Sequence, residues 1–195
     1  VYGTIHDDSK PVTEDVQGYL DTLSVRSSYP MSKRAVENLC AAYAEEYRVH
    51  ARIARLTQTT GAGIAHDDNR IIAQFARLTA NGEDIVLHTK GDSARPYCYT
   101  IDSISAILYI LLKGSDGEAY NVANEDTYIS ARGMAEYLQK NFNPAINVRV
   151  ELGEDFGYAP PTKLRLSSKK LRNLGWVPQY GLKEIFENLI EYLKE

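Results

Sequence analysis

Apolar residues along the chain follow two spacings, which together predict alternating helices and strands. From about Pro30 to Tyr47 they recur every three or four positions, as in a helix with one apolar face. Short apolar runs bounded by glycine, proline and polar clusters predict strands. The expected strands span 50–57, 84–88, 97–101, 119–123 and 146–152, and the other expected helices span 69–79, 104–112, 131–141, 167–174 and 182–194. This alternation predicts an α/β fold with a largely parallel sheet.

Two of the predicted helices carry long apolar stripes. The first presents Val36, Leu39, Cys40, Tyr43 and Tyr47 on one face. The helix at 104–112, "ISAILYILL", is expected to be buried, with the residue at 102, an aspartate, as its N-cap. It is too short to span a bilayer, so we expect no contact with a membrane.

Composition narrows the class of protein. The 195 residues carry a net charge of −4 and no basic stretch, so nucleic acid is not an expected partner. The two cysteines, Cys40 and Cys98, do not form a disulfide framework and are expected to be reduced core residues of a cytoplasmic protein. The four histidines are scattered without metal-ligand spacing, so no metal site is expected.

The stretch "RSSYPMSKRAVENLC" (26–40) contains the clearest candidate for chemistry. Tyr29 and Lys33 stand four positions apart, so both side chains lie on one face of the predicted helix. An ammonium beside a phenol stabilises the tyrosinate form, and such a phenol can exchange protons near neutral pH. The alternative is a surface tyrosine beside a solvated lysine.

A second candidate is Arg95 in "GDSARPYCYTID" (91–102), between a Gly-Asp turn and a strand. Its guanidinium could bind phosphate oxygens in a two-pronged contact. The alternative is a surface arginine that pairs with Asp92.

Six segments in order resemble one known family. They are "VYG" (1–3), "YPMSK" (29–33), "RLTQTTGAG" (55–63), "KGDSARPYCYTID" (90–102), "AYNVAN" (119–124) and "SSKKLRNLGWVP" (167–178). They resemble motifs of the extended short-chain dehydrogenase/reductase family, specifically its NAD-dependent nucleotide-sugar epimerases, dehydratases and decarboxylases. The matches cover essentially the whole chain.

The resemblance implies a fold and a division into domains. The chain is expected to hold the C-terminal part of a Rossmann-type doubly wound parallel sheet, plus a smaller α/β substrate-binding lobe. Residues 1–58 and 97–124 would belong to the dinucleotide-binding domain. Residues 59–96 and 125–195 would form the nucleotide-sugar lobe.

The resemblance also implies roles for five residues. Tyr29 and Lys33 would be catalytic and would contact NAD, with the tyrosinate taking a proton from a sugar hydroxyl while hydride leaves the same carbon. Arg95 would bind the nucleotide diphosphate, with Gln58 near the sugar or phosphates and Arg70 near the nucleotide. A nucleotide-diphosphate sugar is the expected substrate, and a homodimer is the expected assembly.

The departures from the family pattern raise a second interpretation. The sequence has no G-x-x-G-x-x-G cofactor loop, and the family's catalytic Ser or Thr would fall just outside Val1. Gln58, Ala62 and Ser167 replace the usual Asn, Pro and Asp. We therefore expect a C-terminal fragment of such an enzyme, inactive by itself. The alternative is a naturally truncated, non-catalytic module that binds a nucleotide-sugar or a partner chain.

Overall fold

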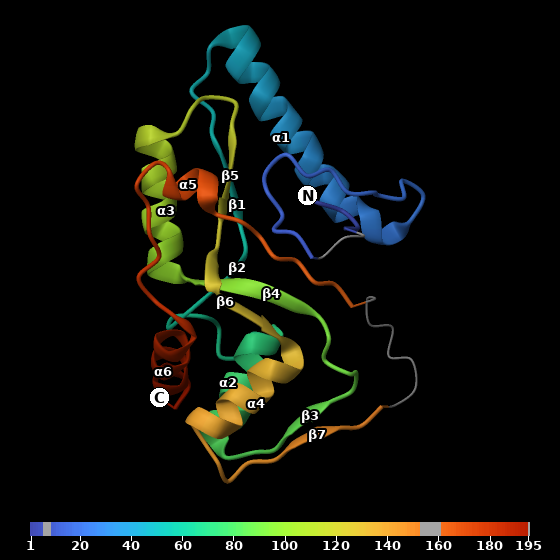
Figure 1. Cartoon of the computed structure of the whole chain (residues 1–195), viewed down its shortest axis with the longest axis vertical. Coiled ribbons are helices and arrows are strands. Elements are labelled where there is room, and N and C mark those ends of the chain that lie inside the picture. Colours follow the sequence, from blue (N-terminus) through green and yellow to red (C-terminus); the bar gives the residue numbers. More distant parts are fainter. Residues whose placement is uncertain (6–8, 153–160, 195) are drawn as a thin grey trace.

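The computed structural model describes residues 1–5, 9–152 and 161–194. Figure 1 shows an elongated α/β molecule in which short sheets follow one another along the long axis. The helices are η1 (Val25–Ser27, a 3-10 turn), α1 (Ser28–Tyr47), α2 (Ile71–Asn81), α3 (Thr100–Lys113), α4 (Ala131–Asn141), α5 (Lys169–Arg172) and α6 (Leu182–Leu193). The strands are β1 (Ile53–Leu56), β2 (Gln58–Thr60), β3 (Ile85–Leu87), β4 (Ala94–Tyr99), β5 (Ala119–Val122), β6 (Asn124–Ser130) and β7 (Val148–Val150).

The strand pairs are mostly parallel. β1 pairs with β5, β2 with β4, and β3 with β7, all in parallel, while β6 pairs antiparallel with β4. In Figure 1, α1 and α3 lie on opposite sides of the β1–β5 pair, and α2, α4 and α6 gather around the lower strands. The predicted α/β class with largely parallel pairing is therefore confirmed.

Three apolar clusters hold these elements together. The largest joins α2, α4 and α6 to β3 and β4, with Ile72, Met134, Leu138, Phe186 and Leu189 at its centre. A second packs α3 against β5, and includes Leu171 and Trp176 from the segment around α5. A third, small cluster joins Tyr2 and Val12 to Ala123 and Leu166. The proposed division into two domains stays a prediction.

Helix α1 contributes to none of these clusters. It has no buried residue, and Val36, Leu39, Tyr43 and Tyr47 of its apolar stripe are each more than half exposed. The prediction that Cys40 is a core residue is wrong, because its helix lies on the surface and the side chain is only half-buried. Cys98 is buried as predicted, and both thiols are free. No helix in the described ranges is both long and apolar enough to cross a membrane.

The prediction that 104–112 is a buried helix is also wrong in part. In α3 the buried face is formed by Ser103, Ala106 and Ile110, which lie against the strands. Ile104, Leu108 and Leu111 point away from the strands and remain about half exposed. The run is apolar all around, so its periodicity could not show which face meets the sheet.

The boundary between β4 and α3 differs from the sequence prediction. β4 ends at Tyr99 and α3 begins at Thr100, so Asp102 lies within the first turn and is not the N-cap. Its carboxylate instead accepts hydrogen bonds from the backbone N–H groups of Gln179 and Tyr180. Strand β6 was also not predicted, because it is largely polar and is defined by its pairing with β4.

Candidate functional site

A groove of about 680 Å³ runs between the start of α1, strands β1 and β2, and the segment before α5. Its volume lies in the range of small-molecule sites. All five residues singled out from the sequence line it: Tyr29, Lys33, Gln58, Arg70 and Arg95. The fold thus brings together positions that are up to 66 residues apart in the chain. They belong to α1, β2, the start of α2 and β4.

Tyr29 and Lys33 lie in the first two turns of α1. Pro30 lies between them in the first turn of the helix. The backbone N–H groups of that turn have no acceptor within the helix, so the missing N–H of proline costs no hydrogen bond. The Lys33 ammonium lies 5.5 Å from the centroid of the Tyr29 ring, so the two side chains share one helix face as predicted. Tyr29 is 69% exposed, and within the described ranges Lys33 forms no ion pair. Both groups are therefore accessible to a ligand in the groove.

Arg70 is held by its own neighbours. Its Nε and Nη2 donate to the Asp68 carboxylate, at 2.9 and 2.5 Å to Oδ2, and its Nη1 donates to the Thr59 carbonyl at 2.7 Å. Hydrogen bonding from Arg70 lowers the pKa of Asp68, although burial acts in the opposite direction. Since its charge is compensated, Arg70 shapes the groove wall and ties the 61–70 loop to β2.

Arg95 has no such partner. It is half-buried on β4, and its guanidinium forms no hydrogen bond or ion pair with Asp92 or with any other described residue. The pairing of β4 with β6 shifts register between Arg95 and Tyr97, and such a bulge re-aims the side chains beside it. Burial raises the pKa of Tyr97 to about 12, with the positive charge of Arg95 acting against the rise.

Gln58 presents an unsatisfied acceptor at the same site. Its Oε1 atom is buried and has no hydrogen-bond partner among the described residues. Buried polar atoms are nearly always paired in native proteins. An orphaned amide oxygen in the wall of a groove is therefore suited to accept a hydrogen bond from a bound molecule.

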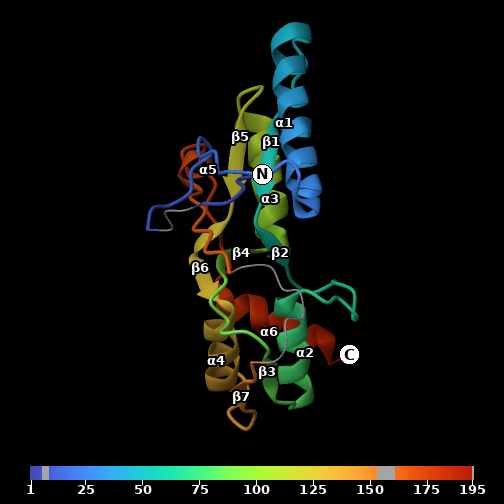
Figure 2. The ribbon, with the colours of Figure 1, turned by 90° about the vertical axis from the view of Figure 1, so that its right-hand side faces the viewer.

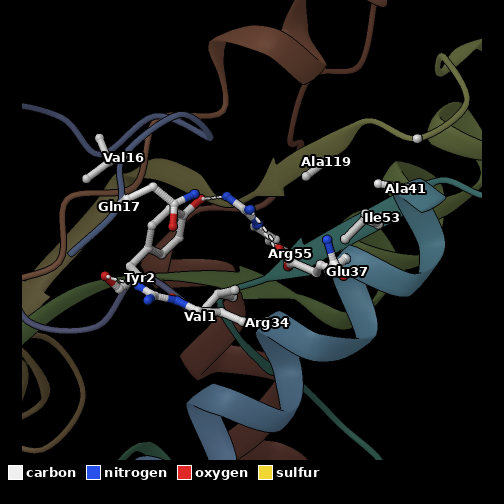
Figure 3. A pocket seen from close by; sticks show the side chains of 12 residues that line it. Val1, Tyr2, Val16, Gln17, Arg34, Glu37, Ala41, Ile53, Arg55 and Ala119 are labelled. Atoms are coloured by element: carbon white, nitrogen blue, oxygen red, sulfur yellow. Dashed lines mark hydrogen bonds and ion pairs between the residues drawn. The ribbon is translucent and has the colours of Figure 1, made fainter. Parts of the chain in front are cut away.

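A further pair at the groove, Glu37 and Arg55, was not predicted from the sequence. Arg55 on β1 donates from Nε and Nη2 to the two Glu37 oxygens, at 2.9 and 2.7 Å. Figure 3 shows this pair beside Tyr2, in an adjoining pocket of about 370 Å³. The available signal was the position of Glu37, one turn beyond Lys33 on the same helix face.

The charges that line the groove do not cancel. Arg55 is compensated by Glu37, and Arg70 by Asp68. Lys33 and Arg95 are left without a carboxylate partner in the described ranges. The groove thus carries two uncompensated positive side chains, which favour an anionic ligand. The described residues contain no cluster of His, Cys, Asp or Glu placed to hold a metal ion.

Known proteins resemble this chain in sequence and in fold. UDP-glucuronic acid decarboxylase 3 from Arabidopsis thaliana is 28% identical over 174 residues, which cover 89% of this chain and 50% of the relative. This chain spans about half the length of the curated relatives it matches.

Two solved structures share the fold. RMD from Pseudomonas aeruginosa, complexed with NADPH, matches with a TM-score of 0.82 at 24% identity, over 100% of this chain and 63% of that one. dTDP-glucose 4,6-dehydratase from Bacillus anthracis, in complex with NAD, matches with a TM-score of 0.78 at 18% identity, over 98% of this chain and 58% of that one. Both therefore support the Rossmann-type α/β fold.

A family model covers the part of the chain that contains α1, the strands β1 and β2 of the groove, and Arg95 on β4. Residues 1–123 match the model described as the NAD dependent epimerase/dehydratase family. This stretch includes Tyr29, Lys33, Gln58, Arg70 and Arg95, while Leu164 and Leu166 of the groove wall lie outside it. The chain belongs to the NAD dependent epimerase/dehydratase family.

Proposed function

We propose that this chain supplies the catalytic helix and the sugar-nucleotide groove of an NAD-dependent nucleotide-sugar epimerase/dehydratase. One observation carries the proposal: the Tyr29–Lys33 pair and the uncompensated Arg95 line the same groove. A proton-exchanging phenol and an anion-binding guanidinium are the two functions that a reaction on a nucleotide-linked sugar requires. Relatives named UDP-glucuronic acid decarboxylases support a nucleotide-sugar as substrate.

The residues of this chain fit one end of a dinucleotide cofactor. Tyr29 and Lys33 offer an exposed hydroxyl and an ammonium that can bind the ribose beside the nicotinamide. The pyrophosphate end needs a glycine-rich turn before a helix N-terminus, and the sequence does not contain that motif. We therefore propose that the cofactor binds to a polypeptide that carries this chain together with a Gly-rich unit, called the full-length protein below.

The proposed chemistry of this chain is a proton transfer. NAD, when bound, supplies the acceptor for a hydride. Tyr29 as tyrosinate takes the proton of a sugar hydroxyl, so that the oxygen can become a carbonyl. Lys33, on the same helix face 5.5 Å from the ring centroid, stabilises the phenolate charge and holds the cofactor ribose. Whether epimerisation, dehydration or decarboxylation follows depends on residues beyond this pair.

The substrate's diphosphate would lie against Arg95. Its guanidinium is free of carboxylates, so it can offer two parallel N–H groups to phosphate oxygens. Gln58 would accept a hydrogen bond from a sugar hydroxyl through its orphaned Oε1. Arg70 is paired with Asp68, so it would lie beside the nucleotide but would not neutralise the nucleotide's negative charge.

The assembly and location follow as further parts of the proposal. The exposed apolar stripe of α1, with Leu39 and Tyr43, suits pairing with a second copy in a homodimer. Two free thiols suit the reducing environment of the cytoplasm.

The second candidate function is a non-catalytic module that binds a nucleotide-sugar or a partner chain. The missing Gly-rich motif favours it, because the groove could bind a nucleotide-sugar without the cofactor. The two candidates differ in whether the phenol of Tyr29 is needed for turnover.

Substitution of Tyr29 in the full-length protein tests the proposal. Tyr29→Phe keeps the ring but has no proton to exchange, so turnover of nucleotide-sugar should fall by roughly 10²–10⁴-fold with little change in NAD affinity. Lys33→Met should lower turnover and also weaken NAD binding. The matched control is Tyr19→Phe, an exposed tyrosine outside the groove. Turnover by Tyr29→Phe at the rate of the control would rule out the catalytic proposal.

A further inference from the structure

Helix α1 is attached to the rest of the molecule by few contacts. None of its residues is buried, and its apolar stripe faces away from the three clusters. Arg34 donates to the carbonyls of Val1 and Gly18, at 2.6 and 2.7 Å, which ties the helix to loop backbone. Among the described residues, the side-chain hydrogen bonds from α1 to a strand are those between Glu37 and Arg55.

The Glu37–Arg55 contact has a fixed geometry. Two parallel N–H···O bonds, at 2.9 and 2.7 Å, join a planar guanidinium to a planar carboxylate. Both side chains are largely shielded from water, with exposed fractions of 11% for Arg55 and 17% for Glu37. A shielded, two-pronged pair restrains both the position and the rotation of the helix that carries it.

Arg55 is in turn held from the other side. Its Nη1 donates to the Tyr2 hydroxyl at 3.0 Å and to the Glu14 carbonyl at 2.8 Å, and its guanidinium stacks on the Tyr2 ring at 5.0 Å. The Tyr2 hydroxyl donates to Oδ1 of Asn121, which is fully buried on β5. Figure 3 shows Arg55 between Tyr2 and Glu37. The network thus runs from the helix through β1 to the interior of β5.

Glu37 lies one turn beyond Lys33 and two turns beyond Tyr29, and all three line the same groove. We propose that Glu37 and Arg55 are positioning residues that fix the Tyr29–Lys33 face of α1 over the groove. This inference rests on the proposed function. It adds that a hydrogen-bonded ion pair to β1 holds the catalytic helix in position. Other helices of this chain are held in position by apolar packing.

Hydrogen exchange in the 195-residue chain tests the anchoring directly. Glu37→Gln keeps the shape of the side chain and touches no core residue, so the chain should fold. We expect the α1 amides to exchange about tenfold faster, while α2, α4 and α6 exchange as in the wild type. Arg55→Lys keeps the charge but loses the two-pronged guanidinium contact, so it should also speed exchange of the α1 amides.

The matched control is Asp84→Asn, which breaks an ion pair with Arg149 outside α1 and should leave α1 exchange unchanged. The double variant Glu37→Gln/Arg55→Lys should speed α1 exchange no more than the more affected single variant does. The reason is that both substitutions remove the same contact. If α1 exchange is unchanged in Glu37→Gln, or if all helices exchange faster together, the inference is overturned.

Kinetics of the full-length protein test the link to catalysis. Glu37→Gln should lower kcat by about tenfold, leave KM for nucleotide-sugar within about threefold, and leave the pH profile in place. A kcat equal to the wild type despite faster α1 exchange would overturn the positioning role. If the wild-type full-length protein itself does not turn over nucleotide-sugar, the proposed function fails, and exchange alone still decides whether the pair holds α1.

Discussion

The Asp102 carboxylate accepts a hydrogen bond from the backbone N–H of Tyr180, 3.0 Å away across 78 positions of sequence. The same carboxylate accepts from the N–H of Gln179 at 3.0 and 3.1 Å, and its side chain is only 2% exposed. The Asn124 amide donates to the Tyr180 carbonyl at 2.8 Å from the other side. Two residues from motifs that resembled the family therefore build a junction for the C-terminal segment and do not line the ligand groove.

Replacing Asp102 should destabilise the chain without changing the groove. Asp102→Asn removes one acceptor oxygen and sets an NH₂ group against the backbone N–H donors of Gln179 and Tyr180, which should cost about 2 to 3 kcal/mol. Urea unfolding measures the loss. The control is Asp92→Asn at an exposed position, which should be close to neutral. Equal stability of the two variants would contradict a structural role for Asp102.

Replacing Arg95 should weaken substrate binding selectively. In the full-length protein, Arg95→Ala should cost about 1.5 to 3 kcal/mol of nucleotide-sugar affinity, the scale of a charge-assisted contact. NAD affinity should barely change. Titration calorimetry with each ligand separates these effects, with Arg132→Ala on the surface of α4 as the control. A parallel fall in both affinities would make Arg95 a folding residue.

The 195-residue chain should bind NAD weakly by itself. It carries Tyr29 and Lys33 on α1, which we propose to bind the cofactor ribose, but its sequence has no Gly-rich turn for the pyrophosphate. Calorimetric titration should give no affinity in the micromolar range, whereas the full-length protein should bind NAD. Micromolar binding by the short chain would show that the cofactor is held by other groups.

Alkaline pH should destabilise the chain through Cys98 and Tyr97. Burial raises the pKa of Cys98 from 9.0 to about 11 and that of Tyr97 from 10.0 to about 12. Between these values the unfolded chain loses the proton while the folded chain keeps it, so stability falls as pH rises. For Cys98 the loss should reach about 2 to 3 kcal/mol by pH 11, at about 1.4 kcal/mol per unit.

Urea unfolding between pH 8 and 11 measures this slope. Cys98→Ala should reduce the slope between pH 9 and 11 and leave the part due to Tyr97, whatever the variant's stability at pH 8. Cys40→Ala, which removes the half-buried thiol of α1, is the control for loss of a cysteine. An unchanged slope in Cys98→Ala would mean that the thiol does not lose its proton on unfolding.

Strong periodicity and local capping made some elements predictable. The helix expected at 131–141 forms over Ala131–Asn141, where the Ser130 side chain caps it by accepting from the Gly133 N–H. The strand β6 was missed because its residues are largely polar and its pairing with β4 is set by tertiary structure. Neither the exposure of α1 nor the bare face of α3 can be read from periodicity, which reports an apolar face and not what covers it.

The site was predictable for a different reason. From their local sequence alone, Tyr29 and Arg95 could equally have been solvated surface residues. The resemblance to a known family indicated that they belong to one site. The Asp68–Arg70 pair, two positions apart, could have been expected from the sequence. The Glu37–Arg55 pair could not, because it joins a helix to a strand whose relative placement only the folded chain defines.

The parallel pairing of β1 with β5 also bears on how the chain reaches its native state. Ile53 aligns with Ala119, so residues 57–118, with β2, α2, β3, β4 and α3, lie between two strands that must meet. Joining these strands closes a long loop, and the chain loses conformational entropy before the hydrogen bonds between the strands stabilise it. Such non-local contacts slow folding. Figure 2 shows β1 and β5 side by side at the end of the molecule away from α2, α4 and α6. We therefore expect the pairing of the strand that carries Arg55 to be one of the slow steps of refolding.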